Sequence, residues 1–145
     1  MSTRLRSRLF TIALAAVLAV ATAVPGTASA NEGKRPRGAA TAVEAEVPTV
    51  GGFDCSGLVR WAYGRVGVDL PHSSYALYNE GRRVDESRLE PGDLLFFEGL
   101  GHVGLYLGRG RMVHAPQTGR DVEVVRLDGS NYGSRLIGAR RVAAA

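Results

Sequence analysis

The chain has 145 residues, with 18 Lys or Arg and 14 Asp or Glu, and its formal net charge is +4. Three of the basic residues, Arg4, Arg6 and Arg8, lie at the extreme N-terminus, and without them 15 basic residues face 14 acidic ones. A nucleic-acid-binding protein needs a basic face, and with this balance none is evident, so no nucleic-acid partner is expected. The single cysteine excludes an intramolecular disulfide.

Residues 1–30 have the pattern of a secretory signal peptide. The N-terminal arginines precede an apolar stretch over residues 9–24, and the Ala-Ser-Ala sequence that ends at Ala30 matches a small-x-small cleavage site. We therefore expect cleavage near Ala30, a secreted, extracellular or cell-wall-associated protein, and no membrane contact after cleavage. The alternative is an uncleaved membrane anchor, although the apolar stretch is short for a span.

The next segment, residues 31–49, is rich in Gly, Ala, Pro and charged residues and has little periodicity. This composition predicts a flexible leader. The folded domain is expected over residues 50–142, a length that supports one modest hydrophobic core.

Cys55 lies at the start of a predicted helix. Apolar residues follow it at helical intervals as far as Val66, Gly67 is a suitable end, and Asp54 suits the N-cap position. The first turn of a helix carries unpaired N–H groups and the positive end of the helix dipole, which favour thiolate over thiol. This placement suits a nucleophile, whereas the alternative is a small buried hydrophobic residue, the common fate of an unpaired cysteine.

Further along the chain, a short second helix is expected over residues 75–80. Short apolar runs separated by Gly-rich links then predict antiparallel strands at 94–97, 102–107, 111–115, 121–127 and 138–142. The predicted fold class is therefore α+β, with N-terminal helices packed on a five- to six-stranded antiparallel sheet.

Two histidines fall at strand ends in this pattern: His102 begins the second strand and His114 lies near the end of the third. Antiparallel neighbours could bring them together as a base for the Cys55 thiol and a partner that sets the tautomer of that base. A zinc site formed by Cys55, His72 and these two histidines has suitable ligand atoms, but its spacing matches no compact metal motif. No metal and no other cofactor is expected.

Five sequence blocks in register resemble the NlpC-type cell-wall peptidases, papain-like cysteine endopeptidases of bacterial envelopes. The blocks are Phe-Asp-Cys-Ser-Gly-Leu-Val (53–59), Leu-Pro-x-Ser-Ser (70–74), Pro-Gly-Asp-Leu-x-Phe-Phe (91–97), His-Val-Gly-x-Tyr-Leu-Gly (102–108) and Met-Val-His-Ala-Pro (112–116). The resemblance covers about residues 52–142 and implies a papain-like fold.

The resemblance also implies roles for individual residues. Cys55 would be the nucleophile, His102 the general base and acid, and His114 the polar residue that orients His102. Asp54 and Ser56 flank the nucleophile, where such enzymes bind polar groups of the substrate. The implied substrate is a peptidoglycan stem peptide, cut next to D-glutamate at the γ-D-glutamyl bond to a diamino acid, and a monomer is expected.

The sequence departs from the family pattern upstream of Cys55. A Tyr-x-Trp-Gly-Gly-like segment is usual there, but no aromatic residue lies between Phe10 and Phe53. Two alternatives therefore stay open: a catalytically silent peptidoglycan-binding module, and a related papain-like amidase or acyltransferase that acts on another bond.

Overall fold

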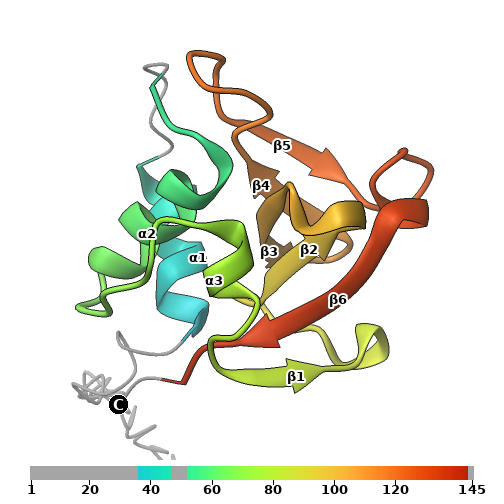
Figure 1. Ribbon diagram of the computed structural model, residues 1–145, viewed down its shortest axis with the longest axis horizontal. Helices are drawn as coiled ribbons and strands as arrows, with labels where there is room; N and C mark the ends of the chain where they lie inside the picture. The colour runs from blue at the N-terminus through green and yellow to red at the C-terminus, as the bar shows by residue number, and fades with distance from the viewer. Residues whose placement is uncertain (1–35, 47–51, 144–145) are drawn as a thin grey trace, which may run out of the picture.

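The computed structural model of the chain describes residues 36–46 and 52–143 (Figure 1). Three α-helices lie together on one side of a curved sheet (Figure 1). They are α1 (Pro36–Ala45), α2 (Cys55–Gly64) and α3 (Ser74–Leu77). Single 3₁₀ turns, η1 (Glu86–Arg88), η2 (Glu98–Leu100) and η3 (Gly133–Arg135), connect some of the strands.

The sheet has six strands in the order β1-β6-β2-β3-β4-β5, and every neighbouring pair is antiparallel. The strands are β1 (Arg82–Val84), β2 (Leu94–Phe97), β3 (Val103–Gly108), β4 (Arg111–His114), β5 (Glu123–Arg126) and β6 (Leu136–Arg141). The predicted α+β class is confirmed. The short strand β1 at the edge of the sheet was not among the predicted strands.

The central strand β2 has apolar residues at all four positions because both faces of the sheet are covered there. Leu94 and Phe96 pack against the helices, whereas Leu95 and Phe97 belong to a second apolar cluster on the opposite face. All four side chains are buried. A strand buried on both faces lacks the alternation of a half-exposed strand.

Part of the expected flexible leader is a packed helix. The buried residues of α1, Ala39, Ala40 and Val43, recur at helical spacing, and the helix packs against α2 and β3. Its small apolar side chains allow close approach to the domain, so burial against the core outweighs a composition that suggests disorder. The expected signal peptide and its cleavage site lie outside the described residues. No helix in the described part of the chain is long and apolar enough to cross a membrane.

Candidate active site

Cys55 is the first residue of α2, as the sequence predicts. Asp54 caps this helix: its side-chain Oδ1 accepts a hydrogen bond of 2.6 Å from the backbone N–H of Gly57, and its backbone carbonyl accepts one of 3.0 Å from Leu58. The thiol is free and half-buried. The sulfur therefore lies at the positive end of the helix dipole without being sealed from solvent.

The Asp54 carboxylate also binds a side chain from the loop before α3. Its two oxygens lie 2.7 and 2.9 Å from Nε2 of His72, and the hydroxyl of Ser56 donates to Oδ1 over 3.4 Å. Burial alone would raise the pKa of Asp54, but the hydrogen bonds from His72 and Gly57 hold it below its usual value. Ser56 is buried, and its hydroxyl donates its hydrogen bond to this carboxylate.

His102 and His114 are brought together, as the strand pattern predicts. His102 immediately precedes β3 and His114 ends β4, and antiparallel pairing of these strands places the two residues at the same end of the sheet. Nε2 of His102 lies 2.9 Å from Nδ1 of His114, with the rings nearly perpendicular at 86°. One imidazole therefore donates a hydrogen bond to the other.

Burial affects the titration of both rings. It lowers the pKa of His102 to about 4, with further lowering by charge repulsion from His114, when that ring is protonated, and from Arg135. Burial also lowers the pKa of His114, which is fully buried, while the negative charge of Glu123 opposes this shift. Both rings are consequently neutral at pH 7, the form in which an imidazole can accept a proton.

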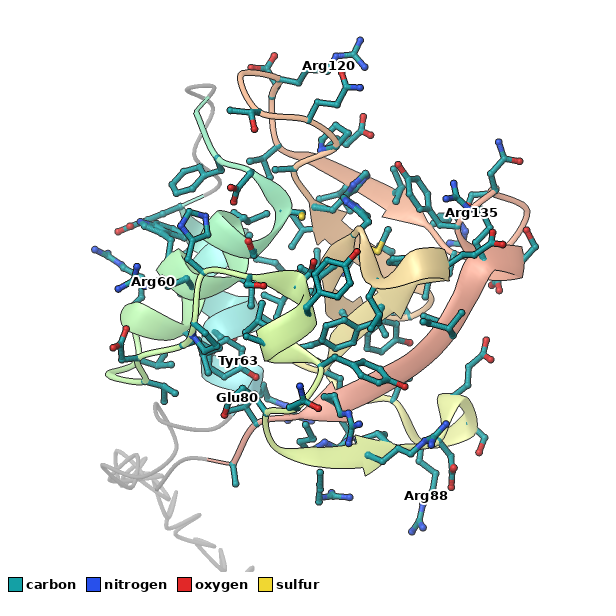
Figure 2. All side chains as sticks on the ribbon, in the orientation of Figure 1. Arg60, Tyr63, Glu80, Arg88, Arg120 and Arg135 are labelled. Atoms are coloured by element: carbon teal, nitrogen blue, oxygen red, sulfur yellow. The ribbon has the colours of Figure 1, made fainter. Side chains whose placement is uncertain are left out.

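Three residues around this pair are not predicted from the sequence. Glu123 of β5 is paired in register with His114, Tyr132 packs edge-on against the His114 ring at 4.8 Å, and Arg135 of η3 lies near His102. Figure 2 shows Arg135 at the end of the sheet where β6 begins. None of the three follows a local motif, because their proximity depends on strand register and on the path of the β5–β6 connection.

Cys55 begins α2, which packs against β3; His102 immediately precedes β3, and His114 ends β4, the strand paired with β3. No hydrogen bond joins the thiol to His102 among the described residues, and Nδ1 of His102 has no hydrogen-bond partner within that same part of the chain. In free enzymes the hydrogen bonds used in catalysis are often long and tighten only with bound substrate. The arrangement can supply a nucleophile at a helix start together with a neutral imidazole base.

A cavity of about 530 Å³ has Asp54 in its wall, while Cys55, His102 and His114 are not among its lining residues. It is lined by Asp54 and His72, by the aromatic pair Phe53 and Trp61, and by basic residues that include Arg60. Figure 2 shows Arg60 pointing away from the sheet. Within residues 36–46 and 52–143, no group of three or more His, Cys, Asp or Glu side chains is placed to hold a metal ion.

Comparison with known sequences identifies relatives of this chain. The sequence profile of the NlpC/P60 family matches residues 32–141. The chain is 52% identical over 81 residues to "Probable endopeptidase Rv2190c" of Mycobacterium tuberculosis, a match that covers 55% of this chain and 21% of the relative. It is 42% identical over 94 residues to "Peptidoglycan endopeptidase RipA" of the same organism, and this match covers 63% of this chain and 20% of RipA. The chain thus spans about a fifth of the length of these relatives.

Solved structures are similar as well. An NlpC/P60 family protein from Bacillus cereus matches with a TM-score of 0.65 and 32% identity, over 79% of this chain and 43% of that chain. A RipA structure with a mutated histidine matches with a TM-score of 0.61 and 28% identity, over 76% of this chain and 64% of that chain. Two further RipA structures carry a mutated cysteine and a mutated glutamate.

Proposed function

Because this chain belongs to the NlpC/P60 family, we propose that it is a peptidoglycan hydrolase, a cysteine endopeptidase in which Cys55, His102 and His114 carry the reaction. The observation that carries the proposal is the 2.9 Å contact between Nε2 of His102 and Nδ1 of His114. This contact uses one nitrogen of His102 and leaves Nδ1 available to the thiol. The same reaction class is supported by the names of two relatives, one called a probable endopeptidase and the other a peptidoglycan endopeptidase.

In the first half of the reaction, Nδ1 of His102 takes the thiol proton of Cys55 and the sulfur attacks the carbonyl carbon of the scissile amide. The backbone N–H of Cys55, at the start of α2, is a suitable donor to the developing oxyanion. As the tetrahedral intermediate collapses, the C–N bond breaks and the leaving amine takes the proton from His102. The product is a thioester on Cys55.

In the second half, water attacks the thioester carbonyl and gives its proton to the same imidazole. The C–S bond then breaks, the sulfur recovers a proton from His102, and the new carboxyl end leaves. His114 would orient His102 in both halves through the hydrogen bond between the rings. The neutral state of His102 at pH 7 suits this role as proton acceptor.

The mutated positions of RipA support this choice of residues. Its mutated histidine and glutamate are numbered twelve positions apart, as are His102 and His114, and a cysteine is the third mutated residue. His114 would then occupy in this chain the position of the RipA glutamate. Both side chains can accept a hydrogen bond from an imidazole N–H.

The proposed substrate is a peptidoglycan stem peptide, cut at the γ-D-glutamyl bond to the diamino acid. Asp54 offers a carboxylate beside the nucleophile that can bind a cationic or N–H group of the stem peptide. Ser56 would assist by holding that carboxylate through its hydroxyl. The cavity that Asp54 also lines would hold the rest of the bound peptide.

The test is digestion of purified peptidoglycan and of a stem tetrapeptide, with the new amine and carboxyl ends identified by mass spectrometry. We expect cleavage next to D-glutamate, with Cys55→Ala reducing the rate by at least about a thousandfold because the nucleophile is lost. Ser87→Ala is the control, because Ser87 is exposed in η1 and its side chain makes no hydrogen bond among the described residues.

Other outcomes would contradict the proposal in recognisable ways. Binding to peptidoglycan without cleavage, equal in wild type and Cys55→Ala, would identify a silent binding module. Release of intact stem peptides from the glycan would identify an amidase. Transfer of the acyl group to an added amine, with no hydrolysis, would identify an acyltransferase.

The cellular setting is part of the same proposal. We infer export by a signal peptide over residues 1–30 with cleavage near Ala30, a catalytic domain over 50–142 against which α1 packs from the preceding segment, and action as a monomer at the cell wall. N-terminal sequencing of the protein recovered from the culture medium or the wall fraction tests the cleavage site.

A further inference from the structure

One side of the His114 ring faces a carboxylate that the proposed mechanism does not use. Glu123 of β5 is the cross-strand partner of His114 in β4, and its Oε1 lies 3.1 Å from Nε2 of His114. The contact is off the N–H direction, so this buried nitrogen has a negative neighbour but no well-aligned hydrogen bond. The Glu123 side chain is half exposed and can adjust its position.

We propose that Glu123 is a positioning residue that sets the tautomer of His114 and, through it, decides which nitrogen of His102 carries the proton. The inference rests on the function proposed above and adds a fourth member to its chain of polar groups. Glu123 would touch neither the substrate nor the reacting atoms. Its influence would pass through the two imidazoles.

The positions of the protons follow from one polar group to the next, starting at Glu123. A carboxylate only accepts hydrogen bonds, so Glu123 favours the His114 tautomer with its proton on Nε2. Nδ1 of that ring then carries a lone pair and must accept from Nε2–H of His102, 2.9 Å away. A neutral His102 with its proton on Nε2 has a free lone pair on Nδ1, which is the form needed to take the thiol proton.

The opposite tautomer would disable the base. If Nδ1 of His114 carried the proton, it would donate to Nε2 of His102 and shift the His102 proton to Nδ1. That nitrogen would then present an N–H to the thiol and could not act as a base. The other groups around the pair do not replace Glu123. The guanidinium of Arg135 carries only donors, the Phe97 ring packs against the His102 ring at 5.8 Å and carries no polar atom, and Tyr132 contacts both histidine rings through its own ring.

Position 123 offers a graded series of substitutions. Glu123→Gln keeps an acceptor oxygen and should lose less than about threefold in kcat, whereas Glu123→Lys presents only donors and should lose on the order of a hundredfold, within the range of general acid–base catalysis. Glu123→Ala should fall between them. KM should stay unchanged across the series, because Glu123 lies behind the histidine pair.

The tautomers can be read directly from the imidazole ¹⁵N chemical shifts of histidine-labelled protein. The chain has three histidines, and His72→Gln leaves only the two of the pair. We expect the wild type to carry the His114 proton on Nε2 and Glu123→Lys to move it to Nδ1. This readout needs no substrate, so a protein without peptidase activity would still report on the tautomer.

Asp128→Asn and Asp128→Lys are the matched controls. Asp128 is an exposed carboxylate just beyond the same strand, paired with Arg126 at 3.7 Å, and its variants make the same changes of charge. They should leave kcat and the ¹⁵N shifts unchanged. Unaltered ¹⁵N shifts in Glu123→Lys, or equal losses of kcat at positions 123 and 128, would overturn the inference. If Glu123→Lys shifted the tautomer but the wild type cleaved no peptidoglycan, the role of Glu123 would be supported and the proposed function would be refuted.

Discussion

The pKa of His102 decides the pH at which its imidazole can act as a base. Burial lowers this pKa to about 4, and the charges of His114 and Arg135 add to the effect. An imidazole with a lowered pKa is protonated only at lower pH, so the base form persists well below the ordinary midpoint near 6.5. The acid limb of kcat/KM should therefore lie nearer pH 4 than pH 6.5.

Arg135→Gln tests the electrostatic part of this shift. Removing a positive charge near His102 stabilises the imidazolium, which raises the pKa of His102 and moves the acid limb to higher pH. Because Arg135 is half exposed, we expect a displacement of about half a pH unit or less, shrinking at high salt. The measurement is the pH profile of kcat/KM at two ionic strengths.

The control for this change is Arg126→Gln, which removes an exposed arginine near the far end of β5. Its pH profile should match that of the wild type. Equal displacement by both variants would mean that overall charge, and not the position of Arg135, moves the acid limb.

At the scale of the elements, the start of α2 depends on a glycine. A Cβ on Gly57 would lie 2.7 Å from Oδ1 of Asp54 and 3.1 Å from Nε2 of His72. The space beside the first turn is already filled by the cap and its partner. Gly57 thus lets one carboxylate bind the helix N-terminus and His72 together.

Gly57→Ala should separate the stability of α2 from the function of its first turn. The weaker cap costs about 1 kcal/mol, and the better helix propensity of alanine offsets a similar amount. The free energy of unfolding should therefore change little, whereas displacement of Asp54 beside Cys55 should lower kcat/KM by about tenfold or more. Urea denaturation and the stem-peptide assay give the two quantities.

Gly64 provides the matched control in the same helix. A Cβ there meets nothing within 4 Å, so Gly64→Ala should not destabilise the protein and should leave Asp54 in place. Because Gly64 also lines the 530 Å³ cavity, the activity of this variant is compared by kcat, which should stay unchanged. Full activity of Gly57→Ala would show that the position of the Asp54 carboxylate is unimportant for the reaction.

At the scale of the whole molecule, a buried ion pair joins parts of the chain that are distant in sequence. Asp93, fully buried before β2, accepts two hydrogen bonds from Arg141 of β6, at 2.7 and 2.8 Å, and one of 2.8 Å from the backbone of Glu90. The Tyr63 hydroxyl of α2 donates to the adjacent carbonyl of Gly92 over 2.8 Å. Figure 2 shows Tyr63 directed inward from α2. The turn at 91–93 therefore links the helices to two strands.

Asp93→Asn should destabilise the domain by about 3 kcal/mol, because it leaves the guanidinium of Arg141 without its buried counter-charge. Glu90, which lies 2.8 Å from Nη1 of Arg141, keeps the loss toward the lower end of the range for broken buried pairs. Urea denaturation measures the change. Glu90→Gln, which alters the exposed partner, should cost less than about 1 kcal/mol, and an equal cost for both variants would contradict this assignment.

Much of this protein can be predicted from local sequence. The helix that begins at Cys55, its Asp54 cap and five of the six strands follow from periodicity and turn residues, which depend on near neighbours in the chain. The proximity of His102 and His114 follows from their positions at the ends of adjacent antiparallel strands. The sequence alone therefore determined the fold class and the candidate residues.

The tertiary structure decided the features that depend on long-range packing. Composition suggested a flexible leader, but α1 forms there and buries Val43 in the core. No local motif linked Glu123 to His114 or Arg135 to His102. These contacts depend on strand register and on the curvature of the sheet, which the balance of burial across the whole domain sets. A residue's electrostatic surroundings are therefore known only once the chain has folded around it.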